Sequence, residues 1–277
     1  MPPESDHVKR NAEINHLMGV GEGVISFISE SLRFLNLSAN GMLNTPNMIT
    51  VMTASNSVFE KILDHAEMPD EFRELIEEVH RTAELLIARH EAPHLSADEL
   101  EAGLPLIFAT NLIGIWGALE SFVGDVFKIS LRYRPDLLAG SAFKGVNLPV
   151  SVLANPEDDA LYTAIYQKVL PPGTGAFEKF EDLLKDVDLR NIGVDPEVKK
   201  KLRAAHQIRN VWAHKSGIAD SHFVTSCPYL PYKVGERVDL DQEAMGELAQ
   251  AIVDYITLIL QRLHKRFEDD GAVSPSN

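Results

Sequence analysis

Residues 105–133, PLIFATNLIGIWGALESFVGDVFKISLRY, decide the fold class of this chain. Their apolar side chains recur at helical spacing and form the stripe Phe108, Leu112, Ile115, Leu119, Phe122 and Val126. No charged residue lies between Glu101 and Glu120, yet the stretch holds Pro105 and three glycines, and the pattern continues to Arg132. Because this run is short for a membrane span and leads into charged positions, we expect a long buried helix of a soluble bundle and no membrane contact.

Three further segments carry helix signals. Residues 70–89 have apolar positions at helical spacing with charged residues between them, and Pro93 follows. Asp195-Pro196-Glu197 provides an N-cap, a proline at the first helical position and an acid in the first turn. The helix that it begins is expected to run to about Trp212, and a last helix is expected over 242–267.

The remaining segments are less regular. Residues 11–66 are expected to form two or three helices with a break at Asn-Thr-Pro-Asn, 44–47, and residues 135–175 look irregular. His222 to Thr225 and Tyr232 to Val238 have the composition of two short strands. The predicted fold class is therefore all-α, a helical bundle with a short β-hairpin or extended segment after the helix that begins at Pro196.

Composition excludes several classes of protein. The 277 residues carry 26 Lys and Arg against 41 Asp and Glu, a net charge of −15, which disfavours a general nucleic-acid binder or a protein on anionic lipid. Cys227 is the one cysteine, so a disulfide framework and a Cys-rich zinc finger are excluded. The first residues have neither a basic nor an apolar signal region, and we expect a cytoplasmic protein.

No metal site is expected. His90-Glu91-Ala92-Pro93-His94 matches the H-E-x-x-H zinc protease pattern, but that chemistry needs both histidines on one face of a continuous helix. Pro93 interrupts the turn between them. No other histidines have the spacing of metal ligands, and we predict no metal and no cofactor.

The helix after Pro196 carries the residues of most chemical interest. Its apolar stripe leads to Arg209, where the pattern calls for a hydrophobic side chain. A guanidinium there stays charged and needs an anion, either an internal carboxylate such as Glu120 or a phosphate. Both interpretations are open. The same segment is strongly basic, with Lys199, Lys200, Lys201, Arg203 and Lys215.

His214 follows Arg209 by five residues. On an unbroken helix the two would lie about 140° apart around the axis and about 7.5 Å apart along it, so they could not share a ligand. They could converge if the helix ended at Trp212 or Ala213, or if a second copy of the chain supplied one of them.

Arg209-Asn210-Val211-Trp212-Ala213-His214 resembles the R-x(4–6)-H motif of HEPN domains, in many of which Asn follows the Arg. Three other pairs in the chain also satisfy the bare pattern, but only this one ends a capped helix in a basic setting. The order of the expected helices is similar to bacterial HEPN groups near the RiboL-PSP family. On this resemblance we divide the chain into 1–95, an N-terminal helical region of unknown role, and 96–270, a HEPN-like helical domain.

The resemblance implies a metal-independent endoribonuclease of a bacterial toxin or phage-defence type. It would cut RNA by attack of the 2′-OH and leave a 2′,3′-cyclic phosphate. His214 would act as general acid and base, because imidazole has a suitable pKa, and Arg209 would stabilise the charged transition state. Asn210 would orient the phosphate or His214, and Glu120 would orient Arg209 or act as its counter-ion.

The resemblance also implies partners. Lys199, Lys200, Lys201, Arg203 and Lys215 would guide the RNA backbone. HEPN domains commonly form homodimers in which two motifs face each other, and an antitoxin or regulator protein would be a further partner. Two other classes of function stay open: a non-catalytic HEPN module that binds RNA, a nucleotide or a protein, and an interaction protein whose acidic surface mimics nucleic acid or binds a basic partner.

Overall fold

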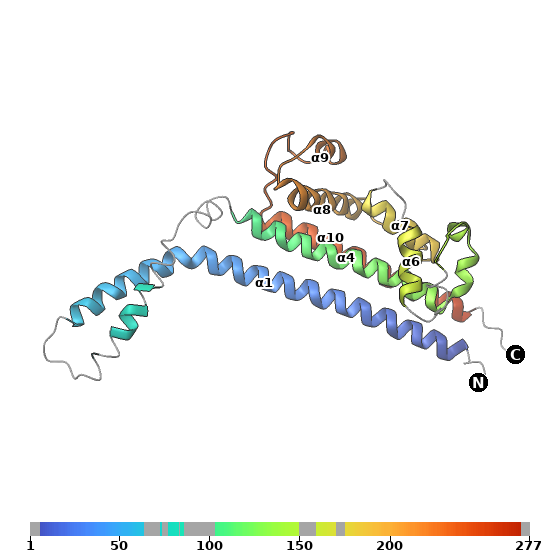
Figure 1. Ribbon diagram of the computed structural model, residues 1–277, viewed down its shortest axis with the longest axis horizontal. Coiled ribbons are helices and arrows are strands. Elements are labelled where there is room, and N and C mark those ends of the chain that lie inside the picture. The colour runs from blue at the N-terminus through green and yellow to red at the C-terminus, as the bar shows by residue number, and fades with distance from the viewer. Residues whose placement is uncertain are drawn as a thin grey trace. The chain divides into compact units, whose positions relative to one another are not determined.

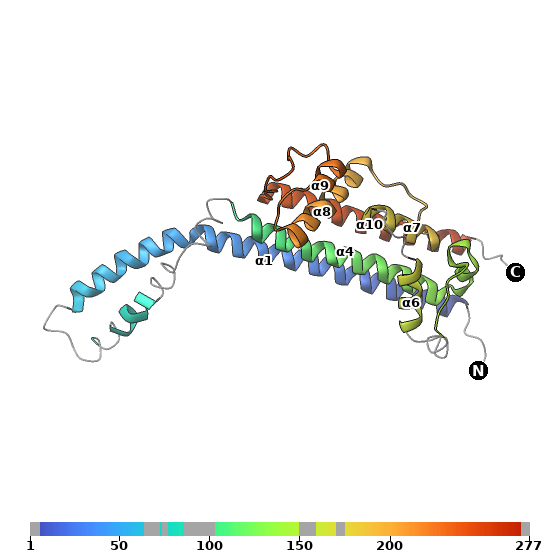
Figure 2. The same ribbon diagram turned by 45° about the horizontal axis from the view of Figure 1, so that its top comes forward.

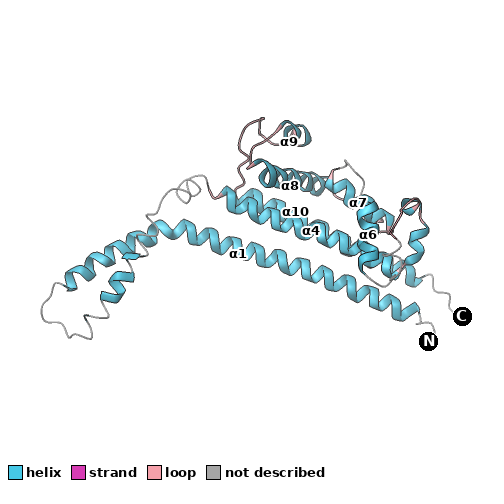
Figure 3. Cartoon of the chain, viewed as in Figure 1, coloured by secondary structure: helices cyan, strands magenta, loops and turns pink. Residues whose placement is uncertain are grey.

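The computed structural model describes residues 6–63, 73, 77–82, 84–85, 103–149, 159–169 and 175–272. Within these ranges every regular element is a helix, which confirms the all-α class (Figure 3). The chain forms two compact units, one made of residues 1–32 and 108–277 and the other of residues 33–107. The helix that carries Arg209 and His214 lies in the first of these, the larger unit.

Helix α1, Asp6–Leu63, is continuous through Pro46. The predicted break at residues 44–47 is therefore wrong. A proline inside a helix removes one backbone hydrogen bond, which more often bends a helix than ends it when helical sequence continues on both sides. Of the predicted helix at 70–89, the described residues 77–82 and 84–85 are helical.

Three helices form the core of the larger unit: α4, Pro105–Tyr133, α8, Pro196–Lys215, and α10, Gln242–Ala272. The bounds of α4 are those that the apolar stripe predicts, and its six stripe residues are buried. α8 packs along α10 (Figures 1 and 2), and the buried side chains of α10 include Ile252, Ile256 and Ile259. Helix α7, Ala176–Asp186, packs against α8.

The first part of α1 belongs to this unit. Arg10 donates to the carbonyl of Phe267, and Glu13 forms a buried ion pair with Arg266. Thus α1 begins where α10 ends (Figure 1). Farther along, Asn111 Nδ2 donates to the carbonyl of Ser31 at 3.1 Å. These contacts fix the beginning of α1 on α10 and the turn around Ser31 on α4.

The expected irregular stretch at 135–175 is partly helical. It contains two 3₁₀ helices, η1, Pro135–Ala139, and η2, Ser141–Phe143, and one α-helix, α6, Asp159–Val169. Leu161, Tyr162 and Ile165 of α6 are buried, so packing of its apolar side stabilises a helix too short to be stable alone. Residues 170–174, part of the proline- and glycine-rich stretch, lie outside the described residues.

The predicted strand at His222–Thr225 is wrong, because these residues lie in helix α9, Ser221–Ser226. The Asp220 side chain accepts a hydrogen bond from the Phe223 N–H at 2.8 Å and caps this helix. That cap outweighs the strand preference of the local side chains. The second predicted strand, Tyr232 to Val238, is an irregular segment with one antiparallel bridge, Ile218 to Arg237.

By length and composition, α4 is the one helix among the described residues that could cross a membrane. Its Trp116, Leu119 and Val123 are fully buried within the larger unit. Because the core helix of a soluble protein has the same composition, this helix is weak evidence for a membrane span. The absence of membrane contact stays a prediction.

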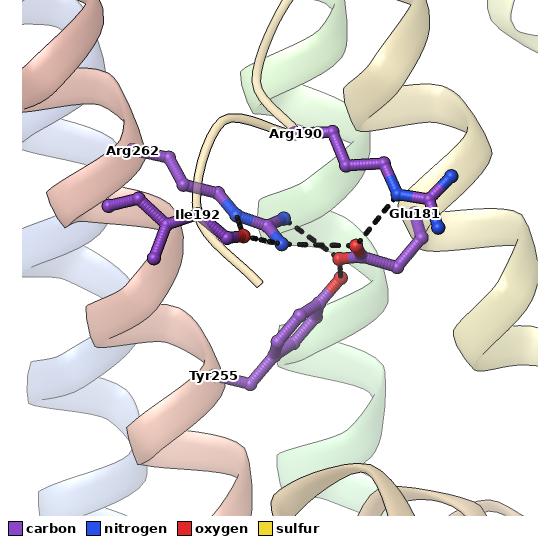
Figure 4. Close-up of polar contacts among 5 residues, drawn as sticks. All are labelled: Glu181, Arg190, Ile192, Tyr255 and Arg262. Carbon is purple, nitrogen blue, oxygen red and sulfur yellow. Dashed lines mark hydrogen bonds and ion pairs between the residues drawn. The ribbon is translucent and has the colours of Figure 1, made fainter. Parts of the chain in front are cut away.

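A buried ion pair joins three parts of the larger unit (Figure 4). Arg262 of α10 is fully buried and donates to both carboxylate oxygens of Glu181 on α7, at 2.8 and 3.0 Å. The same guanidinium donates twice to the carbonyl of Ile192, at 2.8 and 2.6 Å. The Tyr255 hydroxyl adds a bond to Glu181 at 2.7 Å, and burial raises the pKa of Tyr255. This network fixes α7 and the segment around Ile192 on α10.

Arg262→Ala is expected to lower the free energy of unfolding by about 3–5 kcal/mol, because it leaves the Glu181 charge buried without its main partner. Arg190 is the matched control: it lies 3.6 Å from the same carboxylate but is 54% exposed, so Arg190→Ala should cost less than about 1 kcal/mol. Urea denaturation measures both. Equal losses in the two variants would contradict the anchoring role of Arg262.

Candidate functional site

Helix α8 holds the whole Arg209–His214 motif. Asp195 caps its start by accepting hydrogen bonds from the N–H groups of Glu197 and Val198, at 2.8 and 3.3 Å. The helix ends at Lys215, later than predicted, because Ser216 adopts a left-handed conformation with φ 53° and the Gly217 N–H returns to the Val211 carbonyl at 3.0 Å.

Gly217 closes the helix over Trp212. Its φ of +79° favours glycine, and a Cβ at this position would lie 2.9 Å from the Trp212 ring. The indole N–H of Trp212 donates to the Val238 carbonyl at 3.0 Å, and Arg237 stacks over the ring. These contacts hold the irregular segment after α9 against the end of α8, which keeps His214 in the last helical turn.

Arg209 lies at the contact between α8 and α4. Its Nη2 is 3.4 Å from Oε2 of Glu120, and the arginine side chain is 24% exposed. The internal carboxylate, one of the two partners expected for this guanidinium, is therefore present. Arg209 Nε is buried and has no hydrogen-bond partner among the described residues. The guanidinium is held in place but keeps unused donor capacity.

Asn210 connects Arg209 to a histidine that the motif does not include. Arg209 Nη1 donates to Asn210 Oδ1 at 2.9 Å, and Asn210 Nδ2 lies 3.1 Å from Nε2 of His206. Because arginine only donates, Oδ1 must face Arg209 and the amide group must donate to His206. His206 Nε2 is then the acceptor, and the proton of the neutral ring is on Nδ1. The Gln207 side-chain amide lies 3.5 Å from Nδ1, and a proton there requires this amide to face it with its oxygen.

The surroundings of His206 keep it neutral. Burial lowers its pKa to about 4, and the positive charges of Arg209 and Lys179 act in the same direction. Its ring packs on Trp116 of α4, with ring centres 5.2 Å apart. His206 lies outside the R-x(4–6)-H pattern. The signal that could have found it is its position four residues before Asn210, which places both side chains on one helix face.

His214 is exposed in the last turn of α8. Since the helix is continuous to Lys215, His214 lies about 140° around the axis from Arg209 and about 7.5 Å along it. Asn210 is one turn before His214 and about 40° from it, but among the described contacts no hydrogen bond joins the two. Within one chain, Arg209 and His214 therefore do not meet.

The basic residues of α8 contact different neighbours. Lys199 lies over the Phe177 ring of α7, Lys200 over Tyr229, and Lys201 forms an ion pair with Glu247 of α10 at 3.0 Å. Arg203 is ion-paired with Glu178 of α7, and Lys215 is exposed at the end of the helix. The predicted RNA-guiding residues are thus distributed around α8 and do not form one basic face.

Within the described ranges, no group of three or more His, Cys, Asp or Glu side chains is arranged to hold a metal ion. The motif at residues 90–94 lies outside those ranges. No protein-family model, curated protein or solved structure matches this chain. Its function is therefore inferred from the geometry of the site.

His206 should make stability depend on pH. Its pKa is about 4 in the folded chain and near 6.5 when unfolded, so between these values the unfolded chain binds more protons. The contribution of neutral His206 to the free energy of unfolding is therefore fully present above pH 6.5 and is lost as the pH falls toward 4. Between pH 6.5 and 5 the loss is expected to be about 2 kcal/mol.

Denaturation at a series of pH values measures this effect. His206→Gln keeps an acceptor for Asn210 but does not titrate, so its stability should change less over this range than that of the wild type. Replacing the exposed His264 by Gln controls for the loss of one imidazole. Identical pH profiles for the wild type and His206→Gln would show that His206 is not held neutral.

Proposed function

We propose that this chain is a metal-independent, HEPN-type endoribonuclease that leaves a 2′,3′-cyclic phosphate. The observation that carries the proposal is the orientation of Arg209 by Asn210. The 2.9 Å bond from Arg209 Nη1 to Asn210 Oδ1 and the 3.4 Å contact with Glu120 together fix the direction of the guanidinium. Metal-free cleavage of RNA needs a fixed guanidinium and an accessible imidazole, and α8 carries both, on different sides of the helix.

In the proposed reaction, His214 takes the proton of the 2′-OH, and the 2′ oxygen attacks the adjacent phosphorus. The bond from phosphorus to the 5′ oxygen then breaks, and that oxygen takes up the proton from the His214 imidazolium, which returns to its neutral form. Arg209 stabilises the negative charge that develops on the phosphate oxygens. Glu120 holds the guanidinium from the side of α4, and the ion pair seen at 3.4 Å supports this positioning role.

The proposed enzyme is a homodimer in which each site takes Arg209 from one copy and His214 from the other. The divergence of these residues on one straight helix supports this arrangement. Lys215, exposed beside His214, is a candidate contact for the RNA backbone. On this proposal the protein is a cytoplasmic toxin or phage-defence nuclease, with an antitoxin or regulator as a further partner.

A second candidate function is a non-catalytic HEPN module that binds RNA, a nucleotide or a protein. Two observations favour it. Arg209 already has a carboxylate partner in Glu120, and Asn210 is bonded to His206 instead of to His214. Both contacts are expected if Arg209 has a purely structural role.

Cleavage of RNA by single variants distinguishes the two functions. His214→Ala should abolish cleavage with little change in stability, because the residue is exposed; His264→Ala, also exposed, is the matched control. Arg209→Lys should lose most activity while it stays folded, because lysine keeps the charge but lacks the planar fork that binds two phosphate oxygens. Activity should survive EDTA, and mass spectrometry should find the cyclic phosphate.

Other outcomes would support the alternatives. Wild-type cleavage in both Arg209→Lys and His214→Ala would remove the assignment of these residues. Absence of cleavage in the wild type, with a lower melting temperature in Arg209→Ala alone, would favour the binding module. Loss of cleavage on chelation that zinc or manganese restores would contradict the metal-independent mechanism.

A further inference from the structure

A pocket of about 340 Å³ lies between the first turn of α7, the middle of α8 and helix α9. This volume is at the lower end of the roughly 300–1,000 Å³ range of small-ligand sites. Three helices supply its polar lining: Glu178 from α7, Arg203, His206 and Gln207 from α8, and His222 and Ser226 from α9. The lining of the pocket includes neither Arg209 nor His214, so the pocket is a site separate from that of the proposed cleavage of RNA.

Cationic side chains lie around this pocket, although the whole chain carries a net charge of −15: Arg203 lines it, and Arg209 and Lys179 act on His206 at its wall. Four groups act on His206, at the wall of the pocket. Arg209, Lys179 and His222 disfavour its protonation, and Glu178 alone favours it. Positive charge concentrated at one place in an acidic protein attracts anions to that place.

Glu178 occupies the charged side of the pocket. Arg203 Nε and Nη2 both donate to one of its carboxylate oxygens, Oε1. Its other oxygen, Oε2, folds back over Gly175, where an added Cβ would come within 2.6 Å of it. The Glu178 side chain is 35% exposed, so solvent lies beside it on the side away from the pocket wall. A bound anion could then take its place on the Arg203 guanidinium.

We propose that this pocket binds a phosphate group, with Arg203 as its main ligand and Glu178 as an internal anion that the phosphate displaces. A guanidinium with two parallel N–H groups binds phosphate oxygens in bidentate fashion, and His222, Ser226 and Gln207 offer further hydrogen-bond donors. The pocket is large enough for a small phosphate monoester. Its buried Phe177 supplies an apolar wall for the remainder of such a molecule.

Calorimetric titration of the full-length chain with inorganic phosphate at low salt tests this site. Saturable binding is expected. Arg203→Gln should weaken it at least about tenfold, because it removes charged hydrogen bonds to the ligand. Glu178→Gln should strengthen it roughly three- to tenfold, because it removes the competing carboxylate. Opposite effects of two variants that break the same ion pair are not expected of a structural role.

Lys201→Gln is the matched control. Lys201 is also on α8 and is paired with a glutamate of a neighbouring helix, Glu247, but it does not line the pocket. Its loss should change phosphate affinity by less than about twofold. Should Arg203→Gln not fold, Arg203→Lys takes its place, because it keeps the charge but loses the bidentate geometry and should also weaken binding.

Two sources of the phosphate are distinguished by ligand. Oligoribonucleotides with a 5′-phosphate and with a 5′-hydroxyl are compared: tighter binding of the former, lost in Arg203→Gln, identifies the end of an RNA chain, and equal binding identifies a free phosphate compound. Absence of saturable binding of every phosphate ligand, or equal weakening by Arg203→Gln and Lys201→Gln, would overturn the proposal. Phosphate binding without RNA cleavage would support the phosphate site and refute the assignment of the protein as a nuclease.

Discussion

The charge of Arg209 is the constraint on which the arrangement around α8 depends. Arginine cannot lose its charge in a protein, so a guanidinium at a helix contact must have acceptors. Glu120 on α4 is one, and its carboxylate ties two core helices together. Asn210 is the other, and its orientation then determines which nitrogen of His206 carries the proton. One obligatory charge thus sets the positions of three further polar side chains.

The contacts from Arg209 through Asn210 to His206 also connect the proposed catalytic site with the pocket between α7, α8 and α9. His206 bonds to Asn210 on one side and lines the phosphate pocket on the other. An anion beside His206 would favour its protonated form, and a protonated Nε2 could no longer accept from Asn210. On this account, occupancy of the pocket and the hold of Asn210 on Arg209 are physically linked. The buried Glu181–Arg262 pair fixes α7, and with it the opposite wall of the pocket.

Much of this fold follows from local patterns in the sequence. The unbroken apolar stripe of α4 predicts both of its ends, and Asp195-Pro196 predicts the start of α8. The wrong predictions concern segments in which one local signal opposes another, and the sequence alone does not show which signal prevails. Pro46 does not end α1, since residues on both sides of it are helical. Residues 222–225 are helical because the Asp220 side chain caps the start of α9. Helix α6 depends on contacts made by distant parts of the chain.

The candidate site was predictable to a similar degree. The periodicity of α8 predicts Arg209 on the inner face of the helix, where it is partly buried, and the need of its charge for an anion suggests a carboxylate such as Glu120, which the structure places 3.4 Å away. The periodicity does not by itself identify His206. The position of His206 four residues before Asn210 places the two side chains on one helix face, but this spacing does not distinguish a neutral buried ring from an exposed one. Nor does the periodicity fix the end of α8, which depends on the close approach of Gly217 to Trp212.

The central claim is that Arg209 and His214 act from different copies of the chain. Mixing and refolding Arg209→Ala with His214→Ala, each inactive alone, tests it most directly. Random pairing makes about half of the dimers mixed, and each mixed dimer has one complete site, so about a quarter of wild-type ribonuclease activity should return. No recovery of activity, with mixed dimers shown to form, would contradict a site shared between two copies.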